Sequence, residues 1–227
     1  QERGDYQLAA ETVERALHVV RANLGLFTMD QASLMRLLIA SEQATGDFAE
    51  AGKLQERLLT LARRHPDDLR TVPILREAAD RQMAAAKRVL GGDYVPQLMI
   101  NVGYAGDGST TFGGSPSFMA RALIMQAVGN YAAAINVLLR HDLYASEELR
   151  ELEMQLVQIS LDGQYYQYGR NSLRRMVAYD AASLAPWLTC VKGVVHMADW
   201  DLLYSHNGMA VNLYEEIHEE LIRKNVE

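Results

Sequence analysis

Side chains that could do chemistry are few, and the densest group lies near the C-terminus. His196 and Asp199 stand three residues apart on a predicted helix, and Asp201 and His206 follow. Two ligands at this spacing share one helix face, but a zinc site needs three or four ligands and commonly an HExxH-like pattern. We therefore expect ordinary helix-surface residues here. A metal or hydrolase site near His196, Asp199 and His206 is the enzymatic alternative.

Other catalytic motifs do not match the sequence. The glycine-rich residues 106–111 lack the lysine of a phosphate-binding loop and follow no predicted strand. Ser115 follows two glycines without the G-x-S-x-G spacing of a nucleophile elbow. The single cysteine, Cys190, excludes an internal disulfide and any multi-cysteine metal centre, and its apolar surroundings predict a buried structural thiol. We predict no enzyme, no metal and no cofactor.

Length and charge exclude further classes of protein. The chain has 227 residues, with 22 Lys and Arg against 29 Asp and Glu, giving a formal net charge of −7. This acidic balance argues against nucleic acid as the main partner, and no apolar run approaches the roughly 18 residues of a membrane helix. The chain starts at Gln1 without a charged-then-apolar leader, so we expect a processed protein or an excised piece. Its compartment is not readable, although we lean to the bacterial periplasm over the cytoplasm.

The elements that must position any functional residue are predicted to be helices. Ala and Leu are abundant, and apolar residues recur at helical spacing, as in Leu149, Leu152, Leu156 and Ile159. Glycine and aspartate punctuate segments of helical length at residues 46–47, 66–68, 91–93, 129–130 and 162–163. The exception is the glycine-rich stretch 101–116, predicted as a long loop between two helical blocks. The predicted fold class is all-α.

A short motif repeats along the chain. A Gly-polar-aromatic triplet, followed by a small residue, begins at Gly4, Gly46, Gly129 and Gly163, with a degenerate copy at Gly92. The corresponding small-residue positions are Ala9, Ala51, Ala134, Tyr168 and Ala210, separated by 42, 83, 34 and 42 residues. Such a period indicates an array of similar structural units.

This pattern resembles the tetratricopeptide repeat (TPR) family, in which the triplet opens the second helix of a pair and the small residue allows close packing. The 42-residue spacing is similar to that of kinesin light chain repeats, and the whole chain to divergent bacterial members. The resemblance implies a right-handed superhelical array of antiparallel helix pairs, forming one repeat domain over residues 1–227. Because Gly4 would begin a second helix, its first helix is expected upstream of Gln1.

The resemblance also implies a function, namely a non-catalytic scaffold that binds a protein or peptide in a groove lined by the first helices. The lysine-asparagine clamp of chaperone-binding members is not evident, so the groove suits an extended segment or a helix rather than an acidic C-terminus. Counting back from the small-residue positions gives the predicted groove residues: Arg36, Ala40, Gln43, Met119, Leu123, Gln126, Glu153, Val157, Val195, Asp199 and Leu202.

Charge and aromatic patterns leave two alternatives open. Nine basic residues stand against five acidic ones over residues 53–90, while residues 199–227 hold two against seven. Opposite charge at two places could drive self-assembly, which would make the chain a homo-oligomer. The basic cluster Arg63-Arg64-His65 and the tyrosines at 165, 166, 168 and 179 could be recognition residues or ordinary packing and surface residues.

Overall fold

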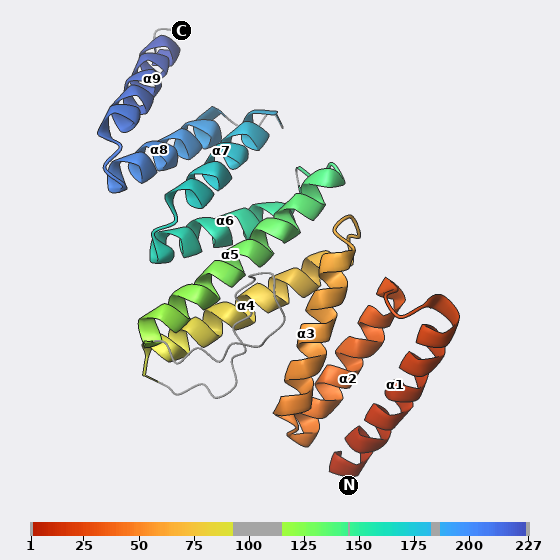
Figure 1. The fold of residues 1–227 in the computed structure, drawn as a ribbon. Helices are drawn as coiled ribbons and strands as arrows, with labels where there is room; N and C mark the ends of the chain where they lie inside the picture. Colours follow the sequence, from red (N-terminus) through yellow and green to blue (C-terminus); the bar gives the residue numbers. More distant parts are fainter. Residues whose placement is uncertain (1, 93–114, 145, 183–186, 226–227) are drawn as a thin grey trace. The chain divides into compact units, whose positions relative to one another are not determined.

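The computed structural model describes the backbone of residues 2–92, 115–144, 146–182 and 187–225, and over these ranges it contains helices and no strand (Figure 1). The all-α class is therefore confirmed. The α-helices are α1 Glu2–Leu24, α2 Ala32–Thr45, α3 Phe48–Arg64, α4 Thr71–Leu90, α5 Pro116–Arg140, α6 Glu147–Gly163, α7 Tyr166–Ala182, α8 Trp187–Leu203 and α9 Asn207–Asn225, with a short 3-10 helix, η1 Met29–Gln31.

The predicted glycine-rich loop falls mostly outside the described residues, which resume at Ser115. Ser115 caps α5, because its side-chain oxygen accepts a hydrogen bond from the backbone N–H of Phe118. Pro116 then occupies the first turn, where its missing N–H is not needed. The side chain of Cys190 also lies outside the described residues.

The chain divides into two compact units, Gln1–Arg81 and Gln82–Glu227, with the boundary inside α4. In the N-terminal unit, α2 packs against both α1 and α3. The buried side chains of these helices and of Ile74 in α4 form one apolar core that includes Leu17, Met35, Leu54 and Leu58. An ion pair between Arg36 and Glu77 links α2 to α4.

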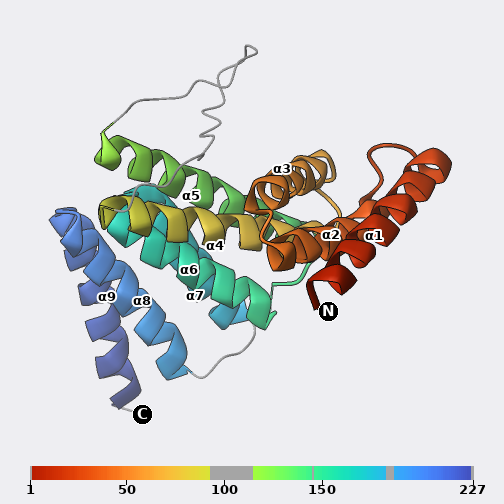
Figure 2. The ribbon, with the colours of Figure 1, turned by 90° about the horizontal axis from the view of Figure 1, so that it is seen from below.

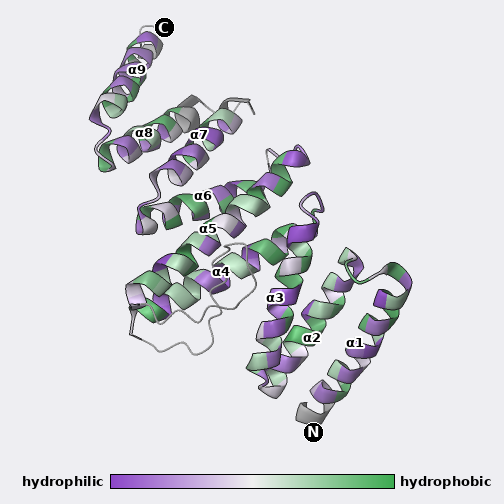
Figure 3. Ribbon diagram, viewed as in Figure 1, coloured by the Kyte–Doolittle hydropathy of each residue, from purple (hydrophilic) through white to green (hydrophobic). Residues whose placement is uncertain are grey.

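In the C-terminal unit each helix from α5 to α9 packs against the next helix in sequence, as Figure 2 shows for α8 and α9. The end of α4 joins this unit through Ala86 and Val89, which contact Ala120 and Leu123 of α5. The helices are amphipathic, with apolar and polar residues on different sides of the ribbon (Figure 3). Their apolar faces are buried between neighbouring helices, which is how a solenoid builds its core.

The turn that joins α2 to α3 recurs between α6 and α7 and between α8 and α9. Each contains one residue in the left-handed region: Gly46 at φ 87°, Gln164 at φ 59° and Ser205 at φ 62°. In each turn the N–H of the next residue donates to the carbonyl five positions back, at 2.8–2.9 Å. These are Schellman turns, which satisfy the last carbonyls of a helix.

Counting five residues on from each left-handed position leads to a buried small residue, namely Ala51, Gly169 or Ala210. The sequence register placed Tyr168 at the small position after the turn between α6 and α7, but Tyr168 is exposed and Gly169 is buried. A Cβ on Gly169 would lie 2.1 Å from the ring of Trp200 in α8. The shift by one residue arises because Gln164, and not Gly163, adopts the left-handed conformation.

The predicted break at Gly129-Asn130 is wrong, because α5 runs without interruption through both residues. Asn130 is buried, and its side-chain amide donates a 2.9 Å hydrogen bond to Gln82 of α4. The amide is thus bound to the neighbouring helix and does not cap a new one. Ala134 is still fully buried, as the repeat predicted.

Helix α5 is also long and apolar enough to cross a membrane by length and composition, although the sequence contains no uninterrupted apolar run of that length. Just over half (56%) of its most apolar window is buried inside the protein. Its apolar side chains, among them Leu123 and Ile135, belong to the core of the unit. A helix packed between neighbours in a globular core meets the same criterion, so this is weak evidence for a membrane span.

Candidate functional site

The predicted groove residues lie in both units and differ in exposure. In the N-terminal unit Gln43 is exposed on α2, and the half-exposed Arg36 is ion-paired with Glu77. In the C-terminal unit Asp199 is exposed on α8 and accepts a hydrogen bond from the hydroxyl of Tyr214. Arg36 and Gln43 lie two turns apart on α2, and a groove contact at any of these positions stays a prediction.

Among the other predicted groove residues, Ala40 and Leu202 are exposed, while several belong to helix packing. Met119 and Gln126 are half-buried on α5, where Met119 packs beside the end of α4 and Gln126 accepts a 3.2 Å hydrogen bond from Gln82. Glu153 of α6 is fully buried, and the guanidinium of Arg175 of α7 donates hydrogen bonds of 2.5 and 2.8 Å to its carboxylate. This carboxylate is therefore a partner for Arg175 inside the unit.

The enzymatic alternative involved His196, Asp199 and His206, and the structure gives each a different environment. His206 lies against the ring of Tyr166, with centroids 4.3 Å apart, while Asp199 bonds Tyr214 of α9 and His196 is exposed. In the part of the chain that is described, no three His, Cys, Asp or Glu residues gather as metal ligands.

Asp201, beside this group, is the centre of a buried polar network. Its carboxylate accepts bonds from the guanidinium of Arg170, at 2.7 and 3.0 Å, and from the hydroxyl of Tyr166, at 2.6 Å. Burial would raise the pKa of Asp201, but these bonds outweigh it and hold the pKa below its usual value. Burial and the bond to Asp201 raise the pKa of Tyr166 to about 12. These hydrogen bonds join α7 to α8, so the role of the network is structural.

The clearest candidate binding site lies in the N-terminal unit and was not predicted. It is a pocket of about 360 Å³, hereafter the Phe27 pocket, formed by the end of α1, the loop before η1, α2 and α3. Its lining residues are Arg21, Leu26, Phe27, Gln31, Met35, Glu56, Arg57, Thr60 and Leu61. The volume is at the lower end of the range for ligand pockets in proteins.

One wall of the pocket is the loop from Gly25 to Thr28, and buried Gln31 fixes it. The side-chain amide of Gln31 donates to the carbonyls of Leu26, Gly25 and Thr28, at 2.9–3.4 Å. Its side-chain oxygen accepts a 2.8 Å bond from the Nε of Arg21. Three hydrogen bonds from one buried side chain therefore hold the carbonyls of this loop in place.

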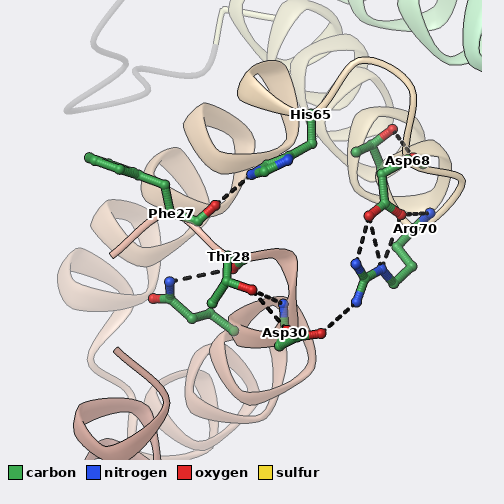
Figure 4. Close-up of polar contacts among 8 residues, drawn as sticks. Phe27, Thr28, Asp30, His65, Asp68 and Arg70 are labelled. Atoms are coloured by element: carbon green, nitrogen blue, oxygen red, sulfur yellow. Dashed lines mark hydrogen bonds and ion pairs between the residues drawn. The ribbon is translucent and has the colours of Figure 1, made fainter. Parts of the chain in front are cut away.

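The same loop is tied to the connection between α3 and α4 (Figure 4). Arg70 binds the carboxylate of Asp68, at 2.7–3.1 Å, and that of Asp30 in η1, at 2.9 Å. The hydroxyl of Thr28 donates to Asp30 at 2.8 Å. Hydrogen bonds from Arg70 hold the pKa values of both Asp30 and Asp68 below their usual value.

Phe27 stands exposed on this loop, with 52% of its surface accessible, yet residues at the end of α3 contact both its ring and its backbone. The guanidinium of Arg64 lies over the aromatic ring, 3.8 Å from the centroid, in a cation–π contact. A ring nitrogen of His65 lies 2.5 Å from the carbonyl oxygen of Phe27 (Figure 4). An exposed aromatic side chain in a fixed position is well suited to recognition.

One part of this site had a signal in the sequence. Two residues of the predicted basic cluster Arg63-Arg64-His65, namely Arg64 and His65, contact Phe27. The apolar residues Leu26 and Phe27, which directly follow Gly25, were the further signal that could have indicated the pocket. The tyrosine cluster splits: Tyr166 joins the Asp201 network, while Tyr179 packs on Tyr144 at 5.6 Å.

The chain matches no protein-family model and no curated protein. Among solved structures it is similar to a kinesin light chain-like protein with nearly identical TPR-like repeats from Podosopora anserina. The identity is 14%, with 99% of this chain and 90% of that one covered, and the TM-score is 0.46. A variant of that protein gives 14% identity, coverage of 100% and 92%, and a TM-score of 0.45.

BtubC from P. vanneervenii is also similar, with 14% identity, coverage of 98% of this chain and 91% of that one, and a TM-score of 0.36. Within the chain itself, consecutive helices pack as pairs, and the same left-handed turn leads to a buried small residue in three of them. These internal features give the protein a TPR-like repeat fold.

Proposed function

We propose that this chain is a non-catalytic scaffold that binds a segment of another protein, with the Phe27 pocket as the main contact of its N-terminal unit. TPR-like folds generally serve protein interaction, although a fold alone does not establish a function. The observation that carries the proposal is Phe27, an exposed aromatic residue that a cation–π contact and a hydrogen bond hold beside a pocket.

A rigid pocket favours binding because little conformational freedom is lost when the partner docks. The loop beside Phe27 is already ordered by Gln31 and by the Arg70 ion pairs. Aromatic and arginine residues at the centre of an interface commonly supply most of its binding free energy. Exposed Gln43 and half-exposed Arg36 on α2, and Asp199 in the C-terminal unit, are proposed as additional contacts of the first helices.

Affinity capture from cells of the source organism, read by mass spectrometry, tests this function. The native chain is compared with Phe27→Ser, which removes the exposed ring, and with Met154→Ser, which removes an exposed apolar side chain of α6. We expect a protein that is retained by the native chain and by Met154→Ser but lost with Phe27→Ser. Retention by all three would place binding elsewhere, and capture of nothing would argue against a scaffold.

Self-assembly is a second candidate, supported by the charge of α9. Exposed Glu215, Glu216 and Glu219 lie on this helix, beside exposed Val211 and Ile222. An acidic face with apolar side chains could contact a basic region of a second copy. Light scattering at high micromolar concentration and low salt would then give more than the mass of one chain, whereas the monomer mass alone would rule this candidate out.

A further inference from the structure

We propose that the Phe27 pocket receives one large apolar side chain of a partner segment in which carboxylates flank that side chain. This inference rests on the proposed function and names the chemistry of the segment that the same site would take. It follows from two properties of the pocket, an apolar interior and a cationic rim.

The interior is apolar because Leu26, Phe27, Met35 and Leu61 contribute to its lining. A volume of about 360 Å³ exceeds what one ordered water requires many times over and accommodates a phenylalanine, leucine or methionine side chain. The flexible thioether of Met35 can adjust to the shape of the inserted group. A polar side chain would lose its hydration there without finding enough partners.

The rim is cationic because Arg21 and Arg57 line the pocket against a single carboxylate, Glu56. Arg64 adds a third guanidinium above Phe27. Among the described residues, neither Arg57 nor Arg64 forms an ion pair with a carboxylate.

The side-chain oxygen of Gln31 accepts a hydrogen bond from the Nε–H of Arg21, which orients the guanidinium. The terminal nitrogens of this guanidinium carry further N–H donors. An oriented guanidinium suits bidentate binding of a carboxylate, and Arg57 adds a second positive charge at the rim, which favours acidic residues next to the apolar one. Negative charge on the partner would also accelerate its association.

Fluorescence anisotropy of a short labelled peptide, with one phenylalanine flanked by glutamates, tests the proposal on the full chain. Two comparison peptides replace the phenylalanine with serine or the glutamates with lysine. We expect the first peptide alone to bind at micromolar affinity and to bind more weakly as salt concentration rises.

Substitutions at two neighbouring positions of the protein should change the binding affinity in opposite directions. Arg57→Glu should weaken binding about tenfold or more, whereas Glu56→Gln should tighten it several-fold because it removes the one carboxylate of the rim. Arg121→Glu, a charge reversal on an exposed residue of α5, should leave the affinity unchanged. Circular dichroism of each variant checks that its helices remain folded.

Equal binding of the lysine peptide, no effect of Arg57→Glu, or no binding of any peptide would each overturn the proposal. If the capture experiment nevertheless returns a partner that depends on Phe27, the scaffold function stands and only this partner chemistry is wrong. If Arg57→Glu instead dissociates an oligomer of the native chain, the occupant is a second copy, and the assignment to another protein fails.

Discussion

At the residue scale, the close approach of α7 and α8 depends on the absence of a side chain at position 169. Gly169 lies under the ring of Trp200, which is buried and whose indole N–H donates to the carbonyl of Tyr166 at 3.2 Å. The ring is therefore fixed from two directions and cannot move aside for a methyl group. Gly129, in the middle of α5, has open space where a Cβ would be.

Replacing Gly169 with alanine should lower the free energy of unfolding by about 1–3 kcal/mol, because overpacking outweighs the gain in helix propensity. Gly129→Ala, in the same unit, should raise it by up to about 1 kcal/mol, since alanine favours a continuous helix. Urea unfolding followed by circular dichroism measures both. A destabilised Gly129→Ala variant would contradict the uninterrupted α5.

The Asp201 network predicts how stability depends on pH. The pKa of Asp201 is lowered in the folded chain, so its stabilising effect is complete above the unfolded pKa of about 3.9 and is lost as pH falls through the folded pKa. Asp201→Asn should be less stable at pH 7, and its free energy of unfolding should decline less between about pH 5 and 2. Glu215→Gln, at an exposed site, should keep the native slope. Parallel curves for native chain and Asp201→Asn would refute the lowered pKa.

At the element scale, the recurring left-handed turn sets the register in which one helix of a pair packs on the next. The turn uses glycine at position 46 but glutamine at position 164. A side chain in the left-handed region is strained, by roughly 1–2 kcal/mol for most residue types. The turn at Gln164 is therefore a place where the native sequence is not the most stable one.

Gln164→Gly should raise the free energy of unfolding by about 1 kcal/mol, because glycine adopts this conformation without strain. Gln158→Gly, at an exposed position inside α6, should lower it by a similar amount. Thermal and urea unfolding measure the pair. Destabilisation by Gln164→Gly would mean that the glutamine side chain contributes more than its backbone strain removes.

These turns also show which parts of the fold could be predicted from the sequence. Apolar periodicity and the Gly-polar-aromatic triplet sufficed for the all-α class and for helix ends such as Gly46-Asp47. The triplet at Gly129 was misleading because Asn130 bonds Gln82 of another helix. The register at Tyr168 was one residue off because Gln164, and not Gly163, adopts the left-handed conformation. Contacts between residues far apart in the sequence, such as Arg64 on Phe27, leave no local pattern, so the geometry of the pocket could not be predicted from the sequence.

At the scale of the whole molecule, the helix pairs act as a frame that keeps a few surface residues in fixed positions. Ion pairs with a buried carboxylate, such as Glu153 with Arg175, hold neighbouring helices together in the C-terminal unit. Schellman turns fix helix ends in each unit. The Phe27 pocket uses this frame most directly, because α1, α2 and α3 each contribute part of its lining. The proposed scaffold function therefore depends mainly on binding at this pocket.

Photo-crosslinking in cells of the source organism tests whether a partner protein contacts this pocket. A photoreactive phenylalanine analogue replaces Phe27 in the full chain, and in a control chain it replaces Met154, an exposed residue of α6. We expect one protein to be crosslinked at position 27 and not at position 154, with the crosslinked peptide rich in acidic and apolar residues. Crosslinking of no protein at position 27, or of the same set of proteins at both positions, would contradict a scaffold that binds through this pocket.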